Sequence, residues 1–277
     1  MDLSSAKIIK ELLLKYGSRP SKGMGQNFLV NKQVLKKIIT AADLKKEDTI
    51  LEIGPGIGTL TMGLADIVKK VVAVEKDRYM CQILKETLKD YKNIEVINND
   101  ILKTNLELPK QYKLVANIPY YLTSPLIRKF LEIKYPPEFM VLMVQKEVAQ
   151  RICANPPNMS ILAVSVQFYA KTKIISYVKK ENFWPKPKVD SAIIKITPNS
   201  TENRSPLANG ERFSSSFFRI VKAGFSQPRK QLGNNLSNVL KLDKQQINLW
   251  LLKNKIKPTQ RAETLSVDDW VKLSEFL

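Results

Sequence analysis

The chain of 277 residues is 44% hydrophobic, enough for one large core and a smaller second domain. Its 45 lysines and arginines exceed its 26 acidic residues, for a formal net charge of +19, and it has no histidine. This charge favours a polyanionic partner, nucleic acid before membrane surface, although a lysine-rich solvated surface would give the same composition. The lack of histidine excludes histidine-based acid–base catalysis, Ser-His and Cys-His nucleophiles and histidine-containing metal sites.

The cysteines and the N-terminus indicate the cellular compartment in which the protein works. Cys81 and Cys153 lack a CxxC spacing, so we expect no metal site and no disulfide framework. The first residues, MDLSSAKIIKELLLKYG, predict an amphipathic helix in a basic arm over 1–30, without the long apolar run of a signal peptide. No stretch approaches the ~18 apolar residues of a membrane span. Free thiols and the lack of these signals indicate a cytoplasmic protein.

Beyond the arm, short apolar runs alternate with helical segments. The residues from Asn31 to Ala42 place apolar side chains at helical spacing, and β-branched apolar runs follow. This alternation predicts an α/β fold with a parallel sheet and helices on both faces. The expected strands are Thr49–Ile53, Val71–Glu75, Ile94–Asn98, Tyr112–Asn117 and Phe139–Val144, and the expected helices are Thr59–Ile67, Arg78–Leu88 and Ser124–Glu132.

The last third of the chain changes character. A final pair of strands is expected at Ile174–Val178 and Ala192–Ile196, ending a first domain over 31–198. Residues 199–210 are polar and rich in Pro, Gly, Asn and Ser, as in a linker. Residues 211–277 show no strand pattern and predict a small all-α domain, whose last helix begins at a capping box from Ser266 to Asp269.

A glycine-rich turn follows the first strand of the predicted sheet. The segment LEIGPGIGT, residues 51–59, lets the backbone pass close to a ligand at the carboxyl edge of the sheet. Thr59 stands where the dinucleotide fingerprint G-x-G-x-x-G requires glycine, which weakens a nicotinamide interpretation. Glu52 puts a negative charge before the turn, which would repel a pyrophosphate but attract a sulfonium or amino group. Glycines that only make a tight turn are the structural alternative.

Two further strands end near carboxylates. Glu75 ends the second strand, where a carboxylate can accept from both ribose hydroxyls. Asp100 follows the third strand and can accept from an adenine amino group. Together with the glycine turn, these residues predict a ligand that carries adenine, ribose and a cationic amino-acid tail without phosphates.

The residues at these positions resemble those of the S-adenosylmethionine-dependent methyltransferases, specifically the ribosomal RNA adenine N6-dimethyltransferases of the kasugamycin-resistance type. The resemblance covers nearly the whole chain. One part is shared with the erythromycin-resistance methyltransferases of large-subunit RNA: KGMGQNFL (22–29), the turn Glu52–Gly58, Glu75, Asp100, NIPY (117–120) and NFWPKPKVDSA (182–192). The other part resembles the bacterial small-subunit enzymes: GFSQPRKQLGNNL (224–236) and QRAETL (260–265).

The resemblance implies a Rossmann-like methyltransferase domain over 31–198, a helical RNA-binding domain over 211–277 and the cofactor S-adenosylmethionine. The implied reaction is dimethylation of N6 of two adjacent adenosines in the 3'-terminal hairpin loop of small-subunit rRNA, carried out by a monomer on an immature small ribosomal subunit. The GQNFL segment would close over the methionine end of the cofactor. The expected cofactor-binding residues are Gln26, Asn27, Leu29, Glu52, Gly54, Gly56, Gly58, Glu75, Asp100, Ile101 and Asn117.

The NIPY segment carries the expected chemistry, because methyl transfer from a sulfonium develops positive charge on adenine N6. The Asn117 side-chain carbonyl and the Ile118 main-chain carbonyl are candidate acceptors for the amino group, and Pro119 stiffens the backbone that carries them. Tyr120 and Phe183 offer the two faces between which the target base can stack. Tyr121 and Trp184 are interpreted as packing aromatics. The expected catalytic residues are therefore Asn117, Ile118, Pro119, Tyr120 and Phe183.

Basic residues of the arm and of the C-terminal domain are expected to contact phosphates. Two alternatives stay open: a large-subunit rRNA adenine methyltransferase of the macrolide-resistance type, and a non-catalytic ribosome assembly factor on the same scaffold. The segments 224–236 and 261–265 argue against the first alternative. The presence of Gly54, Glu75, Asp100 and Asn117 argues against the second. The expected RNA-binding residues are Lys22, Lys222, Arg229 and Lys230.

Overall fold

The computed structural model describes residues 2–21, 23–199 and 210–275, with side chains from 215 onward in the last range. By their internal contacts, the residues form two compact units, Met1–Ala149 with Lys173–Pro198 and Gln150–Thr172 with Asn199–Leu277. The second unit therefore includes a segment, 150–172, that lies inside the range expected for the first domain. Among the described residues, no helix is long and apolar enough to cross a membrane.

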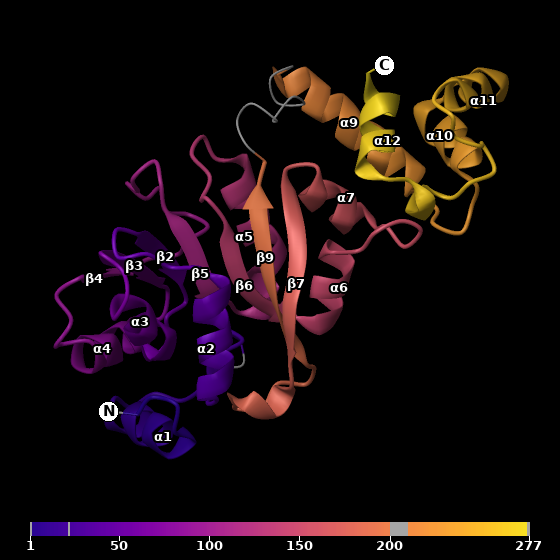
Figure 1. Cartoon of the computed structure of the whole chain (residues 1–277). Helices are drawn as coiled ribbons and strands as arrows, with labels where there is room; N and C mark the ends of the chain where they lie inside the picture. The colour runs from indigo at the N-terminus through magenta and orange to yellow at the C-terminus, as the bar shows by residue number, and fades with distance from the viewer. Residues whose placement is uncertain (1, 22, 200–209, 276–277) are drawn as a thin grey trace. The chain divides into compact units, whose positions relative to one another are not determined.

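A seven-stranded sheet forms the centre of the first unit (Figure 1). Its order is β4-β3-β2-β5-β6-β9-β7, so the strand order reverses between β2 and β5, where α/β sheets bind ligands beyond the carboxyl ends of the strands. The central strands are buried on both faces, which their continuous apolar runs predict. The strands are β2 (Thr49–Ile53), β3 (Lys70–Glu75), β4 (Ile94–Asn98), β5 (Lys113–Asn117), β6 (Met140–Gln145), β7 (Ala170–Val178) and β9 (Ser191–Pro198).

The sheet is parallel from β4 to β6, as predicted, but β9 pairs with β6 in the antiparallel sense. Only the short segment 179–190 separates β7 from its neighbour β9, which leaves no room for a crossover helix, so β9 runs back antiparallel to β7. The prediction of a parallel sheet was therefore wrong for β9.

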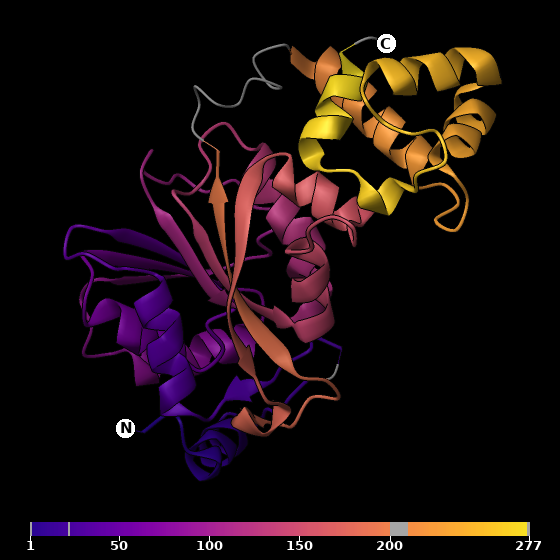
Figure 2. The same ribbon diagram turned by 45° about the vertical axis from the view of Figure 1, so that its right-hand side comes forward.

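Helices cover both faces of the sheet (Figures 1 and 2). On one face, Val34 and Ile38 of α2 and Leu60 and Leu64 of α3 pack against inward-facing residues of the strands. On the other face lies α5, which buries four apolar residues at helical spacing. The bounds are α2 (Lys32–Ala41), α3 (Thr59–Ala65), α4 (Arg78–Thr87), α5 (Thr123–Glu132) and α6 (Lys146–Ile152), with short 3-10 turns at η1 (Tyr120–Leu122) and η2 (Lys180–Asn182).

The N-terminal residues form part of the core of the first unit. Helix α1 (Ala6–Lys15) buries Ile9, Leu12 and Leu13 against Phe28 and residues of α4. Beside it, β1 (Phe28–Leu29) and β8 (Phe183–Trp184) pair as a two-stranded antiparallel ribbon. These strands are too short to show a period in the sequence, and so they were not predicted.

The second unit consists of helices around an aromatic core. Phe168 and Phe217 stack with ring centroids 4.0 Å apart, and Trp270 is fully buried. The capping box predicted at Ser266 is present, with Asp269 as its reciprocal partner. The helices are α7 (Ile161–Gln167), α9 (Gly210–Gly224), α10 (Leu232–Leu240), α11 (Lys244–Lys253) and α12 (Val267–Ser274), with a 3-10 turn at η3 (Ala262–Thr264).

Candidate active site

A cavity lies at the carboxyl edge of the sheet, where the strand order reverses. Its empty volume, which includes open solvent at its mouth, is about 1210 Å³. Every residue expected to be catalytic lines it, and so does every residue expected to bind cofactor except Gly58. The lining comes from Met24–Leu29, Glu52–Gly56, Thr59–Leu60, Val74–Lys76, Asn99–Leu102, Asn117–Leu122 and Phe183.

The glycine turn allows three chain segments to meet at this cavity. Gly54 has φ +68°, and a Cβ atom there would lie 3.6 Å from Cδ of Pro119. Gly56 has φ +60°, and a Cβ atom would lie 3.3 Å from the ring of Phe28. Gly58, by contrast, is the N-cap of α3 and packs against α4 rather than facing the cavity. Its cofactor contact stays a prediction, and its visible role is packing.

The Glu75 carboxylate is buried in the cavity wall with both oxygens engaged by main-chain N–H groups. Oε2 accepts from Gly56 N at 3.1 Å and Oε1 from Asp77 N at 2.9 Å. Burial raises the pKa of Glu75, and these two hydrogen bonds oppose that rise. The carboxylate is thereby held in place at the end of β3, next to the glycine turn.

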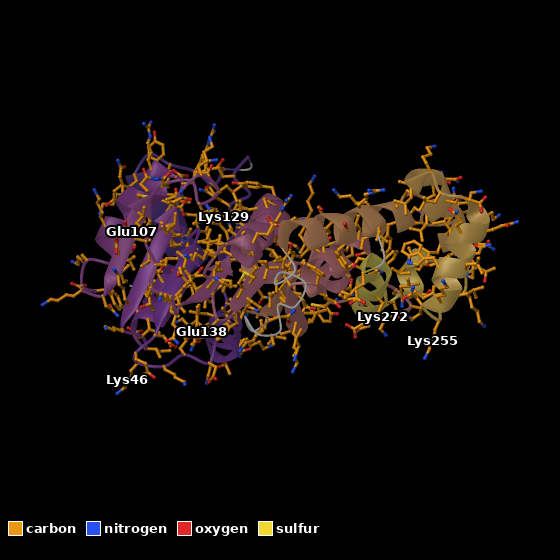
Figure 3. All side chains as sticks on the ribbon, turned by 90° about the horizontal axis from the view of Figure 1, so that it is seen from above. Lys46, Glu107, Lys129, Glu138, Lys255 and Lys272 are labelled. Carbon is orange, nitrogen blue, oxygen red and sulfur yellow. The ribbon has the colours of Figure 1, made fainter. Side chains whose placement is uncertain are left out.

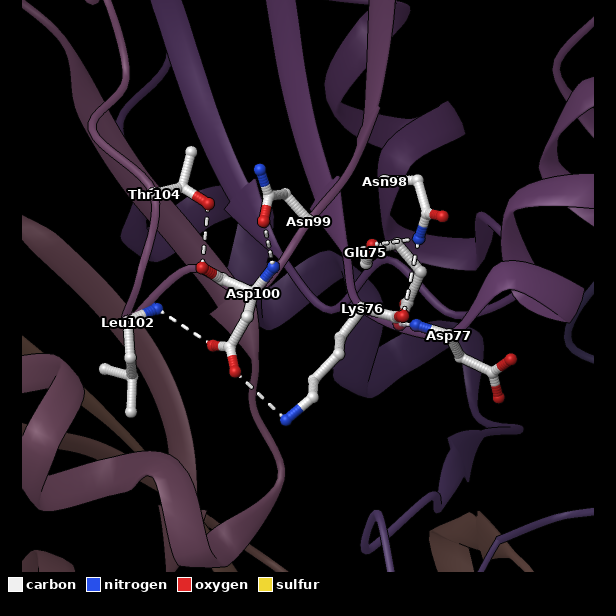
Figure 4. Close-up of polar contacts among 8 residues, drawn as sticks. All are labelled: Glu75, Lys76, Asp77, Asn98, Asn99, Asp100, Leu102 and Thr104. Atoms are coloured by element: carbon white, nitrogen blue, oxygen red, sulfur yellow. Dashed lines mark hydrogen bonds and ion pairs between the residues drawn. The ribbon is translucent and has the colours of Figure 1, made fainter.

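Asp100 lies across from Glu75 at the end of the neighbouring strand (Figure 4). Its Oδ2 is 3.0 Å from Lys76 Nζ, and its Oδ1 accepts from Leu102 N at 3.0 Å. The hydrogen bond to Lys76 is the main reason that the pKa of Asp100 is lowered. Asp100 is therefore an ionised acceptor at the cavity. Asn98 Nδ2 donates to the Glu75 carbonyl, which ties the end of β4 to the end of β3.

Glu52 is buried in the inner wall, with 1% of its surface exposed. Its Oε2 has no hydrogen-bond partner among the described residues. Burial, and to a smaller extent the nearby Glu75, raises the pKa of Glu52 to about 8. A carboxyl group with this raised pKa is protonated at neutral pH, so Glu52 offers the unpartnered Oε2 as a hydrogen-bond acceptor rather than a negative charge.

The NIPY segment continues from β5 into the cavity. Asn117 is the last residue of β5, and its Nδ2 donates to the Asn27 carbonyl at the long distance of 3.5 Å. Pro119 lies between Gly25 and Gly54, so it separates two walls of the site. The Tyr120 hydroxyl is 2.8 Å from Ser191 Oγ, which fixes the ring, and burial raises the pKa of that hydroxyl.

Two aromatic residues complete the wall. Phe183 reaches the site because β8 pairs with β1, which places it opposite Leu29. It is buried, with 4% of its surface exposed. Tyr121 also lines the cavity but is 56% exposed, so its interpretation as a packing aromatic was wrong. Trp184 does pack, 6.4 Å from Phe28 between ring centroids.

The residues expected to bind RNA in the second unit are exposed. Lys222 projects from α9, and Arg229 and Lys230 lie in the loop between α9 and α10. None of the three forms an ion pair with a described residue. The loop is held by buried Asn235, whose Nδ2 donates to the carbonyls of Gly224 and Gln227. Lys22 lies outside the described residues.

Comparison with known proteins assigns the chain to a family. Residues 18–277 match the family model described as ribosomal RNA adenine dimethylase. The chain belongs to this family. It is 44% identical over 268 residues to ribosomal RNA small subunit methyltransferase A of Dehalococcoides mccartyi strain CBDB1, covering 95% of this chain and 90% of the relative. The protein of the same name from Clostridioides difficile strain 630 is 42% identical, with 99% and 96% covered.

Two solved structures are similar in fold to this chain. The 23S rRNA methyltransferase ErmE has a TM-score of 0.74 at 27% identity, covering 90% of this chain and 98% of that one. A dimethyladenosine transferase from Plasmodium falciparum has a TM-score of 0.73 at 31% identity, covering 88% and 95%. The family and the fold class expected from the sequence, a Rossmann-like methyltransferase sheet with a small helical domain, are confirmed.

Two residues at or next to this cavity, Lys76 and Asp77, were not predicted from the sequence, because their contacts depend on the direction of their side chains. Lys76 and Asp77 directly follow Glu75, and they contact Asp100 and Gln26 respectively. Their position in the sequence could have indicated them, since they directly follow Glu75 at the end of β3. Which way each side chain points could not be read from spacing. Gln26 was expected as a cofactor ligand, and in the structure its side chain is engaged by Asp77 and Ser21.

Proposed function

We propose that this chain transfers methyl groups from S-adenosylmethionine to N6 of two adjacent adenosines in the 3'-terminal hairpin loop of small-subunit rRNA. Membership of the ribosomal RNA adenine dimethylase family supplies the enzyme class. The proposal adds the cofactor, the hairpin loop and an immature small ribosomal subunit in the cytoplasm as substrate, acted on by a monomer. The observation that carries it is the convergence of Glu75, Asp100 and the NIPY segment on one cavity.

The cavity wall fits the proposed cofactor in three chemical respects. Glu75 offers a fixed carboxylate for ribose hydroxyls, and Asp100 an ionised acceptor for the adenine amino group, with Ile101 beside it. The glycines at 54 and 56 leave main chain accessible where a Cβ atom would crowd the site. Glu52 brings a buried, unpartnered carboxyl oxygen to the same wall, suited to accept a hydrogen bond from the cofactor. Asn27 and Leu29 border the same space, as the proposed closing segment requires.

When bound, the cofactor would supply an electrophilic methyl group on a sulfonium. The residues of the chain act on the other reactant, the adenine amino group. The amino nitrogen gains positive charge as its new bond forms, so acceptors aimed at its N–H groups stabilise the transition state. Asn117 Oδ1 and the Ile118 carbonyl are these acceptors, and Pro119, directly after them, restricts the backbone that carries them. The proton can leave to water, which is consistent with a chain that has no histidine.

Two aromatic side chains would hold the base for this reaction. A base taken out of its helix loses stacking, and an aromatic face replaces it. The Tyr120 ring, tied to Ser191, and the Phe183 ring both line the cavity. A site that acts on the amino group through hydrogen-bond acceptors can also receive a nitrogen that already carries one methyl, which is compatible with two successive transfers.

The small-subunit substrate is favoured over a large-subunit one by the relatives. The proteins named ribosomal RNA small subunit methyltransferase A are above 40% identical over nearly the whole chain, whereas ErmE is 27% identical. Primer extension on both rRNAs, after incubation with the protein and cofactor, tests this choice. We expect a modification stop in the small-subunit RNA alone. A stop found only in large-subunit RNA would overturn the choice of substrate.

The variant Asn117→Ala tests the mechanism and the alternative of a non-catalytic assembly factor. Loss of an acceptor that acts in the transition state should lower kcat by about 10²–10³-fold, by analogy with a single oxyanion-hole donor. RNA binding should be largely retained, because the side chain is not part of the basic surface. The measurement is mass spectrometry of small-subunit rRNA after reaction of immature subunits with labelled cofactor. Full activity of the variant would contradict the mechanism, and an inactive native chain would favour the assembly factor.

A further inference from the structure

The GQNFL segment, here called the closing segment (Gly25–Leu29), forms one wall of the cavity and contacts the NIPY segment. A Cβ atom on Gly25 would lie 3.5 Å from Cβ of Pro119 and 3.8 Å from the Tyr121 ring. The carboxyl half of the closing segment is held by the pairing of β1 with β8. Its amino half, from Gly25 to Asn27, pairs with no strand of the described residues and is held by hydrogen bonds of the Gln26 and Asn27 side chains and of the Gln26 main chain.

Gln26 makes those contacts. Its Nε2 donates to Asp77 Oδ2 at 2.8 Å, and its Oε1 accepts from Ser21 N at 2.8 Å. The main-chain N–H of Gln26 also donates to the Ser21 carbonyl at 3.2 Å. The amide side chain therefore links its own loop to the start of α4, 51 residues along the chain. A hydrogen bond to an ionised carboxylate is stronger than one between neutral groups.

Asp77 connects this contact to the proposed ribose site. It is 8% exposed, its Oδ1 accepts from Tyr79 N at 2.9 Å as the N-cap of α4, and its own N–H donates to Glu75 Oε1. Figure 4 shows Asp77 directly beyond Glu75 and Lys76 at the end of β3. Ser21, Gln26, Asp77 and Glu75 thus form one continuous chain of hydrogen bonds.

The next residue of the closing segment, Asn27, contacts the side-chain amide of Asn117. Asn27 Nδ2 donates to the Gly25 carbonyl at 3.0 Å, and the Asn27 carbonyl accepts from Asn117 Nδ2. An asparagine that donates through Nδ2 to a fixed carbonyl has its Oδ1 free as an acceptor. The position of the closing segment therefore decides which atom of the Asn117 amide is available to the substrate.

We propose that Gln26 and Asp77 form a latch that holds the closing segment in place, and that Gln26 is a positioning residue for both the cofactor and the Asn117 amide. The identity of the cofactor rests on the proposed function. The latch links Glu75 on one side of the cavity to Asn117 on the other. Loss of the latch should therefore weaken cofactor binding and slow methyl transfer together.

The chemistry of the pair allows a test by exchange. Gln26→Glu places two carboxylates face to face, and Asp77→Asn places two amide NH₂ groups face to face. The double variant Gln26→Glu/Asp77→Asn restores one donor and one acceptor. In it, the new amide at position 77 can donate to the new carboxylate at position 26, which still accepts from Ser21 N. Asparagine also serves as an N-cap, so the start of α4 keeps its hydrogen bond in both variants that carry Asp77→Asn.

The measurement is calorimetric titration of the full chain with S-adenosylhomocysteine, followed by steady-state kinetics on immature small subunits. We expect each single variant to raise Kd by about tenfold, the effect of one charge-assisted hydrogen bond, and to lower kcat as well. The double variant should return Kd to within about threefold of the native value. The control is Glu86→Gln, which removes the negative charge that pairs with Lys15 between α1 and α4 but leaves the closing segment untouched. It should leave Kd unchanged.

The outcomes separate the latch from the function on which it rests. Single variants that bind as tightly as the native chain, or a double variant no better than the weaker single one, would overturn the latch. A native chain that binds no S-adenosylhomocysteine would instead overturn the cofactor assignment. A rise of Kd in Glu86→Gln equal to that in Gln26→Glu would show a general loosening of the N-terminal segment and would also overturn the latch.

Discussion

The sequence predicts where the side chains of this site lie, but not their protonation states or the directions of their hydrogen bonds. Glu75 and Asn117 end their strands, and Glu52 and Asp100 lie within two residues of a strand end. Because the carboxyl ends of parallel strands share one edge, the convergence of these four residues could be predicted. Protonation state and hydrogen-bond direction depend on burial and on partners far along the chain. Neither the unpaired oxygen of Glu52 nor the contact of Gln26 with Asp77 could be read from spacing.

The buried Glu52 makes the stability of the fold depend on pH. Its pKa is about 8 in the folded chain, above the ordinary value of 4.5, so the folded state binds the extra proton between these two values. The favourable contribution is complete below pH 4.5 and is lost as the pH rises through 8. Measured by urea unfolding, the native chain should lose at most about 5 kcal/mol of unfolding free energy over this range, at about 1.36 kcal/mol per pKa unit.

The neutral isostere Glu52→Gln should flatten this dependence. It should be more stable than the native chain at pH 9 and similar to it at pH 5. Glu47→Gln, at an exposed position before β2, is the matched control and should leave the native profile unchanged. Parallel profiles for the native chain and Glu52→Gln would show that Glu52 is ionised at neutral pH.

At the scale of elements, the periodicity of apolar residues predicted most of the helices and strands. It did not predict the short strands β1 and β8 or the packing of α1. The strands of the parallel part begin and end within one residue of the expected bounds, because buried apolar runs have sharp polar limits. The ribbon of β1 and β8 brings Phe28 and Phe183 together across the chain by pairing that no local pattern encodes. Likewise α1, expected as part of a basic arm, buries three apolar residues in the core.

The motif GFSQPRKQLGNNL illustrates how a segment expected to dock RNA is also a packing element. Gly224 ends α9 against α12, where a Cβ atom would overlap the Trp270 ring. Asn235 in the same motif is 2% exposed and bonds to the Gly224 carbonyl. The buried residues of this motif therefore maintain the loop that presents Arg229 and Lys230.

The variant Gly224→Ala should destabilise the second unit. The added methyl group forces the Trp270 ring to move, and overpacking of this kind typically costs about 1–3 kcal/mol. Thermal unfolding followed by Trp fluorescence measures the loss, and binding of S-adenosylhomocysteine should persist because the cavity belongs to the first unit. Gly23→Ala, where a Cβ atom meets nothing closer than 3.9 Å, is the control. Equal stability of Gly224→Ala and the native chain would contradict the packing role.

At the scale of the whole molecule, the main feature is the net charge of +19, from which the sequence predicts a polyanionic partner. Lysines such as Lys46 and Lys255 extend from the surface of both units (Figure 3). An excess of positive charge gives sequence-independent attraction to RNA, with a steep dependence on salt. Specific docking requires more, namely basic side chains fixed in register with particular phosphates.

The paired variant Arg229→Ala/Lys230→Ala tests whether the α9–α10 loop provides such contacts. If each side chain neutralises one phosphate, the slope of log K against log salt concentration should fall in magnitude by about 1.4–1.8. Affinity for a small-subunit rRNA fragment, measured by filter binding at several salt concentrations, gives this slope. Affinity for S-adenosylhomocysteine should not change, since neither residue lines the cavity.

The matched control is Lys45→Ala/Lys46→Ala, which removes the same charge from exposed positions just before β2, at the amino ends of the parallel strands. General electrostatic attraction would make the two double variants equal in affinity and slope, because each lowers the net charge by the same amount. Docking through the loop held by Asn235 would make the Arg229→Ala/Lys230→Ala variant weaker, with the difference growing as salt is lowered. Equal slopes for the two would therefore contradict an RNA-docking role for this loop and leave the overall charge as the source of affinity.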